Sequence, residues 1–164
     1  MNHLRYWTGL WTLLLAFTLC GCQEDDVMEI FTSRGTWYWS TSADTSDWEK
    51  DNAKTRVTLS PEEQRQIRNA KDSYYIRFLD DGTIEGKGQS FTFTGQWSAN
   101  PDDRSVSIRI NTDRDPSGML DKRFLNELQN ARHYRGNSLM LKLGNAEKDH
   151  FIQISHVKNN EIQE

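Results

Sequence analysis

Apolar and polar residues alternate one by one along several stretches of this chain, and no other feature limits the fold more. The alternation is clearest at residues 91–97, 105–110 and 139–143. Successive side chains of a β-strand point to opposite faces, so each stretch predicts a strand with one buried face. We expect the leucines of 139–143 and the aromatic residues of 91–97 to face the core. One solvated face is typical of antiparallel sheets.

Turn signals connect further strands. Residues 75–79 and 83–86 are apolar stretches on either side of Asp80-Asp81-Gly82. Gly82 can adopt a positive φ, so this segment predicts a hairpin. Residues 37–39 and 150–154 are the expected first and last strands.

Two segments have a helical period instead. Ser60-Pro61-Glu62-Glu63 is a capping sequence and predicts a helix to about Lys71 that lies outside the core. From Ser117 the apolar residues follow helical spacing to near Gly136, in a stripe formed by Leu120, Phe124, Leu125 and Leu128. The fold class is therefore α+β, with a curled, barrel-like antiparallel sheet of about six to eight strands and two helices packed outside.

The N-terminus has the features of a bacterial lipoprotein signal. Arg5 precedes an apolar run over residues 10–19 that is too short for a membrane-spanning helix of about 20 residues. Leu19-Cys20-Gly21-Cys22 then matches a lipobox. We expect residues 1–21 to be removed and Cys22 to carry acyl chains, including palmitate. The alternative is an uncleaved anchor that happens to end in cysteine.

The residues after Cys22 indicate a destination. Gln23 stands where an Asp is associated with inner-membrane retention, which favours the outer membrane of a Gram-negative bacterium. The anchored domain either faces the periplasm or is exposed on the cell surface, and the sequence leaves both alternatives open. We expect an acidic tether over residues 22–34, one folded domain over 35–157 and a flexible tail over 158–164.

Composition excludes several kinds of chemistry. The chain has two cysteines; one would leave with the signal and the other would be lipidated, so no disulfide or thiolate site is expected. Its formal net charge is −4 and its positive residues are dispersed, which argues against nucleic acid. We recognise no catalytic constellation and no cofactor motif, and we predict that the protein is not an enzyme.

One loop partly resembles a calcium site. Asp113, Asp115, Ser117, Gly118 and Asp121 match positions 1, 3, 5, 6 and 9 of an EF-hand loop. The twelfth position, which needs a bidentate Glu, is Phe124. A helix start capped by Asp or Ser, with Pro116 nearby, explains the segment better, so calcium is a weak candidate and no metal is predicted.

The histidines do not suggest a metal pair. His150 and His156 share strand parity, but six residues place them roughly 20 Å apart along a strand, too far for one ion. His133 is expected at the end of the second helix, where a satisfied or solvated imidazole is the ordinary state.

The aromatic residues leave two alternatives. Trp37 and Trp39 share one face of the first strand, and Phe93 and Trp97 can meet them across a curled sheet. These four side chains either fill the core or line a pocket for a small apolar or glycan ligand. Trp48 lies in a polar stretch, where it is either an exposed aromatic or a lid folded onto the core.

The order of these elements resembles the META domain of HslJ-type envelope proteins over most of residues 35–157. The resemblance rests on the segments Gly35–Trp37, Phe78–Gly86, Phe91–Trp97, Phe124–Leu128 and Leu139–Leu141. The cysteine common in that family is absent, because Gly88-Gln89-Ser90 stands in its place. The pattern is also similar to lipocalin-like small lipoproteins.

Both resemblances imply an envelope protein without a known catalytic residue. We therefore expect an outer-membrane-anchored lipoprotein with a non-catalytic interaction or structural role, whose partners are the membrane and envelope proteins. The alternative is a binding module that holds a small apolar or glycan ligand inside its sheet.

Overall fold

The computed structural model describes residues 24–50, 54–70 and 72–156, which form nine strands and three helices. The helices are α2 (Glu24–Thr32), α3 (Pro61–Asn69) and α4 (Met119–Gln129). The strands are β1 (Thr36–Thr45), β2 (Thr55–Val57), β3 (Tyr75–Phe78), β4 (Thr83–Lys87), β5 (Thr92–Asn100), β6 (Ser105–Thr112), β7 (His133–Gly136), β8 (Met140–Gly144) and β9 (His150–Ser155). None of these helices is long and apolar enough to cross a membrane.

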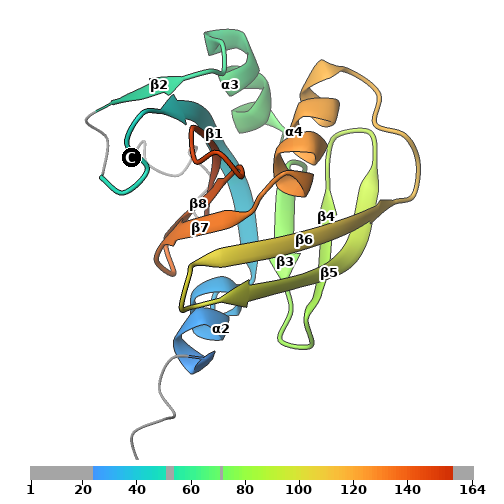
Figure 1. The fold of residues 1–164 in the computed structure, drawn as a ribbon. Helices are drawn as coiled ribbons and strands as arrows, with labels where there is room; N and C mark the ends of the chain where they lie inside the picture. The colour runs from blue at the N-terminus through green and yellow to red at the C-terminus, as the bar shows by residue number, and fades with distance from the viewer. Residues whose placement is uncertain (1–23, 51–53, 71, 157–164) are drawn as a thin grey trace, which may run out of the picture.

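The strands form one antiparallel sheet that curls into a ring (Figure 1). β3 to β9 pair in sequence order, and β1 closes the ring by pairing with both β3 and β9. The short strand β2 pairs with the last three residues of β1, at 43–45. The α+β class and the curled antiparallel sheet are thus confirmed, with nine strands and three helices where we expected about six to eight and two.

Local sequence rules hold in the hairpin and in the first predicted helix. Gly82 has a φ of 80° in the turn between β3 and β4. Ser60 and Glu63 form a reciprocal capping box at the start of α3, and Ile67 is the buried residue of that helix. The hairpin and the exterior helix are therefore confirmed.

Helix α2 closes one end of the ring, at the bottom of Figure 1. Phe31 is fully buried, and its ring centroid lies 4.8 Å from that of Trp97 and 4.9 Å from that of Phe78. The indole nitrogen of Trp37 donates a hydrogen bond of 2.7 Å to the carbonyl of Phe31.

The expected tether over residues 22–34 is therefore wrong for residues 24–32, which form α2. Val27 and Phe31 are four residues apart, so a helix places both on one apolar face that packs into the core. Cys22 itself, the signal segment and residues 158–164 lie outside the described residues.

Helix α4 lies at the opposite end of the ring, where Phe124 stacks on Trp39 with ring centroids 5.3 Å apart. It ends at Gln129, earlier than the predicted end near Gly136. Residues 133–136 form β7 instead, because their backbone pairs with β8. The helical stripe itself ends at Leu128, inside α4, and the strand that follows is set by sheet pairing.

One leucine departs from the predicted alternation. Leu141 and Leu143 are buried as expected, but Leu139 is 52% exposed. It precedes β8, and its amide donates to the side chain of Asn137 in the turn. The first leucine therefore belongs to a turn, where strand parity does not apply.

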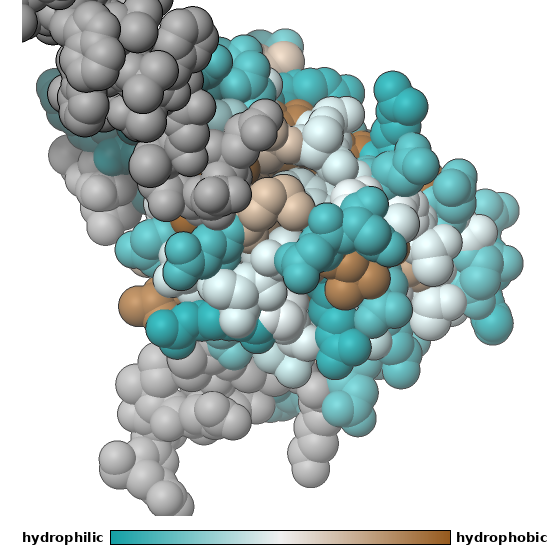
Figure 2. Space-filling view, turned by 90° about the horizontal axis from the view of Figure 1, so that it is seen from below, coloured by the Kyte–Doolittle hydropathy of each residue, from teal (hydrophilic) through white to brown (hydrophobic). Residues whose placement is uncertain are grey.

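The surface seen from below Figure 1 is mostly hydrophilic or intermediate where the grey atoms leave it uncovered (Figure 2). Hydrophobic residues are scattered over it singly. This uncovered area has no broad apolar patch of the kind that marks an obligate protein interface.

Candidate functional site

A hollow of about 650 Å³ lies between the C-terminal half of α4 and the hairpin of β8 and β9. We call it the α4–β9 pocket. It is lined by Arg123, Asn126, Glu127, Asn130, Arg132, Leu143, Asn145, Ala146, Glu147, His150 and Ile152. Most of these side chains are polar or charged, and of the apolar residues 143, 146 and 152 only Ala146 is exposed.

Helix α4 supplies one wall of this pocket because it carries two stripes. Its apolar stripe, at positions 120, 124 and 128, is buried in the core. Its polar stripe consists of Arg123, Asn126, Glu127 and Asn130, at the spacing i, i+3, i+4 and i+7 that places residues on one helix face. The predicted helix already contained this second stripe, and the sequence analysis missed it.

Glu127 is the buried charge at the floor of the pocket. It is 9% exposed, and its Oε1 accepts a hydrogen bond of 2.8 Å from Arg123 Nε and lies 3.3 Å from His150 Nε2. Its Oε2 accepts a hydrogen bond from the hydroxyl of Ser42. A buried carboxylate is costly without partners, and here three side chains supply them.

His150 is held between two carboxylates. Its Nδ1 lies 2.8 Å from Asp44 Oδ1, on the side opposite Glu127. Hydrogen bonding to Glu127 raises the pKa of His150 above its ordinary value of 6.5, and Asp44 adds to this effect while burial opposes it. Arg56 and His150 together lower the pKa of Asp44. The protonated imidazolium therefore fits this position best.

The residue types of a catalytic triad are present, but their arrangement differs from one. Ser42 is fully buried and donates to Glu127, and both ring nitrogens of His150 face carboxylates. No nitrogen of His150 is free to accept the proton of Ser42, as a nucleophile's base must. The geometry gives this cluster a structural role that joins β1, β9 and α4.

Other groups at the pocket have atoms left for a ligand. Asn130 Nδ2 donates to Asn126 Oδ1 at 3.0 Å, which leaves Asn126 Nδ2 and Asn130 Oδ1 without a hydrogen bond to the described residues. Arg132 uses one terminal nitrogen for the carbonyls of Gln129 and Ala131. It forms no ion pair with a carboxylate in the described part of the chain.

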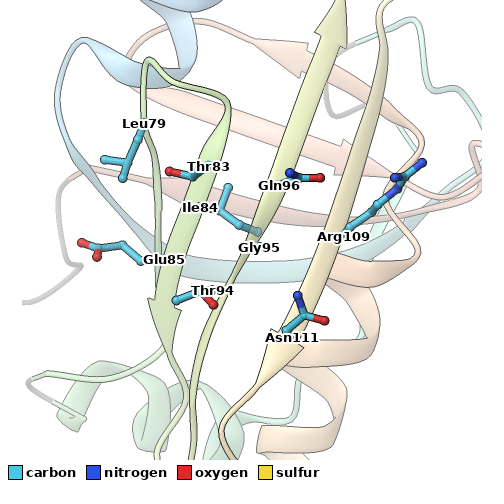
Figure 3. Close-up of a pocket in the computed structure, with 9 residues that line it drawn as sticks. All are labelled: Leu79, Thr83, Ile84, Glu85, Thr94, Gly95, Gln96, Arg109 and Asn111. Carbon is cyan, nitrogen blue, oxygen red and sulfur yellow. The ribbon is translucent and has the colours of Figure 1, made fainter.

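A second hollow, of about 660 Å³, lies on the outer face of β4, β5 and β6 (Figure 3). Its lining includes the polar side chains of Glu85, Thr94, Gln96, Arg109 and Asn111, which are solvated or half-buried. No buried charge supports it, in contrast to the α4–β9 pocket. We therefore take the α4–β9 pocket as the candidate site.

Comparison with known proteins identifies the family. The model of a domain of unknown function (DUF4847) matches residues 22–156. The chain belongs to the DUF4847 family. A crystal structure of a DUF4847 family protein from Bacteroides vulgatus ATCC 8482 is 32% identical, with a TM-score of 0.66, over 80% of this chain and 98% of that one.

Two further comparisons add little. An NMR structure of a protein from Burkholderia xenovorans covers 79% of this chain and 85% of its own, at 10% identity and a TM-score of 0.48. The search among curated proteins found no match.

The resemblance to META domains and lipocalin-like lipoproteins is therefore wrong, because DUF4847 is a different family. The segments that suggested it were a glycine-containing hairpin and alternating aromatic strands. Any curled antiparallel sheet requires such turns and such parity, so these patterns indicate the fold class and do not distinguish families.

The four aromatic candidates lie in the core of this DUF4847 domain. Trp37, Trp39, Phe93 and Trp97 are 0%, 3%, 2% and 6% exposed. Trp39 packs against Tyr74 and Phe124, and Trp97 packs against Phe31. Trp48 is also buried, on the outer side of the sheet, where it contacts Phe151 and covers Gly144. It is therefore neither an exposed aromatic nor a lid on the core, because it belongs to a small separate cluster with Ala43 and Phe151.

The calcium candidates of the DUF4847 domain have other partners. Asp113 Oδ1 accepts from the amide of Thr92, and the buried Asp121 accepts from the amides of Gln89 and Ser90 and from the Ser90 hydroxyl. The amide of Ser117 donates to the same hydroxyl, while Asp115 is exposed. No group of three or more metal-ligating side chains occurs in residues 24–50, 54–70 and 72–156.

The expected helix cap at this loop is wrong too. The N-cap of α4 is Gly118, with a φ of 94° and no side-chain hydrogen bond. Asp121, in the first turn, instead binds the backbone of the loop at 88–90. Asp121, which the sequence offered only as a weak calcium ligand, serves a distant loop, a relation that sequence spacing does not reveal.

The remaining histidines have local roles. His156 Nδ1 lies 2.7 Å from the carbonyl of Thr36, and its ring lies against that of Trp37. His133 is the first residue of β7, so its expected place at a helix end is wrong. Neither residue belongs to the α4–β9 pocket.

Proposed function

We propose that this protein is a lipid-anchored protein of the cell envelope that acts by binding at its outer surface and does not catalyse a reaction. The single observation that carries the surface role is the filled interior. Trp37 and Trp39 are packed against neighbouring side chains at the centre of the ring. An interior ligand would have to displace them at a cost of several kcal/mol.

The anchor rests on the sequence. Leu19-Cys20-Gly21-Cys22 favours acylation of Cys22, and Gln23 favours the outer membrane. The folded part is compatible with a short linkage, because α2 begins only two residues after Cys22. The proposed arrangement therefore holds the ring close to the membrane surface. A ligand held inside the sheet stays the alternative function, and the packed indoles argue against it.

Metabolic labelling with an alkyne analogue of palmitate tests the anchor. The wild-type chain and the matched control Cys20→Ser should be labelled, whereas Cys22→Ser should not. Labelling of Cys22→Ser, or labelling that is lost in Cys20→Ser alone, would contradict the assignment of the lipidated residue.

Native mass spectrometry of the detergent-extracted protein tests the surface role. We expect the mass of the acylated chain without a retained apolar molecule, because the buried side chains of Trp37 and Trp39 occupy the interior. A stoichiometric apolar ligand that survives extraction would support the interior-binding alternative instead.

A further inference from the structure

We propose that the α4–β9 pocket binds a neutral carbohydrate of one or two sugar rings. This inference rests on the proposed function, since it names the ligand of a protein that acts by surface binding. The pocket volume of about 650 Å³ lies within the range of small-molecule sites, about 300–1,000 Å³.

The charges of the pocket favour a neutral ligand. Arg123 and His150, the cations at the floor, are already paired with Glu127, and His150 also with Asp44. The two remaining charges of the lining, Arg132 and Glu147, have opposite signs. No excess charge is left to attract an ionic ligand.

The free hydrogen-bonding atoms favour hydroxyl groups. Asn126 offers an amide nitrogen as a donor and Asn130 an amide oxygen as an acceptor, one helical turn apart. A sugar hydroxyl both donates and accepts, so adjacent hydroxyls satisfy both amides. The guanidinium of Arg132 supplies further donors beside them.

The rest of the lining suits the other side of a sugar ring. Of the three apolar lining residues, Ala146 is exposed and can pack against the C–H groups of a ring, whereas Leu143 and Ile152 are each 1% exposed and add little contact area. The lining contains no Trp, Tyr or Phe. Each net hydrogen bond lowers Kd by a factor of about 5. About four of them lower Kd about 600-fold from the 1 M standard state, which gives an expected Kd of about 1 mM.

Saturation-transfer NMR on the full-length protein, extracted in a detergent without a sugar headgroup, tests this proposal. The probes are glucose, galactose, mannose and N-acetylglucosamine at about 10 mM, ten times the expected Kd, with glucuronate and galacturonate as acidic counterparts. We expect transfer to at least one neutral sugar that exceeds transfer to both acidic sugars.

A pair of double variants locates the site. Asn126→Ala with Asn130→Ala should weaken Kd at least about tenfold, because two hydrogen-bonding groups are lost. The matched control, Lys122→Ala with Gln129→Ala, changes exposed residues of the same helix that do not line the pocket and should leave Kd unchanged. Thermal unfolding of both variants shows whether the fold is retained.

Three results would overturn the proposal: no transfer to any neutral sugar, transfer to the acidic sugars alone, or binding that survives the Asn126 and Asn130 substitutions. Each of them can occur while Cys22 is labelled normally by palmitate. The failure of the sugar site is thereby distinguished from the failure of the lipid anchor.

Discussion

Glu127 Oε1 lies 3.3 Å from His150 Nε2 and so joins helix α4 to strand β9 across the floor of the α4–β9 pocket. The imidazole is held from the other side by Asp44 of β1. One protonated side chain thereby connects three elements that are far apart in the sequence, and the stability of this end of the ring depends on its charge.

We expect the protein to lose stability as the pH rises above about 6.5. The pKa of His150 is raised by Glu127 and Asp44, so the folded state keeps its proton at pH values where the unfolded state has released it. The contribution is complete below 6.5 and is lost as the pH passes through the raised pKa. Urea unfolding at several pH values measures it.

The substitution His150→Gln should flatten this part of the pH profile. Glu147→Gln is the matched control, since it removes a carboxylate from the same hairpin that does not pair with His150. An unchanged slope in His150→Gln would show that another group causes the pH dependence.

Phe31→Ala should destabilise the protein by about 3–5 kcal/mol, because it removes a fully buried ring between Phe78, Trp97 and Tyr134. Met119→Ala, at a position that is 87% exposed, should change the free energy of unfolding by less than about 0.5 kcal/mol. Chemical denaturation compares them. If the two variants were equally stable, α2 would not be part of the folded core.

Gly95→Ala should be more harmful than Gly35→Ala. A Cβ at position 95 would lie 1.8 Å from the carbonyl oxygen of Arg109, a backbone atom that cannot rotate away, so the cost should reach or exceed about 3 kcal/mol. At position 35 the space is open and only the positive φ of 78° opposes a side chain, at about 1–2 kcal/mol. Unfolding temperatures in the reverse order would contradict this account of the contact between β5 and β6.

Asp121→Ala should destabilise the protein by about 3 kcal/mol, because the amides of Gln89 and Ser90 lose their acceptor. Asp115→Ala, at an exposed position in the same loop region, should have little effect. Differential scanning calorimetry measures both.

Calcium should leave the unfolding temperature of the wild type unchanged in the same measurement. A bound ion at 100 times its Kd would add about 2.7 kcal/mol to stability. A rise in the unfolding temperature that depends on calcium and disappears in Asp121→Ala would support a calcium site in this segment.

The sequence by itself determined the elements whose signal is local. The capping box at Ser60, the turn at Gly82 and the alternation through Phe93 and Trp97 each depend on residues that are neighbours in the chain. Backbone sterics and the strand period act over a few residues, so these features could be predicted. Many folds share such short patterns of turns and alternation. These patterns could therefore not identify the family.

Only the tertiary structure decided which distant residues meet. The ring closes because β1 pairs with β9, and the floor of the α4–β9 pocket forms because Glu127 reaches Ser42 and His150. The end of α4 and the strand character of residues 133–136 depend on pairing with β8. Such contacts gain their energy from burial and hydrogen bonding between segments that are separated in the chain, and no local pattern encodes that partner choice.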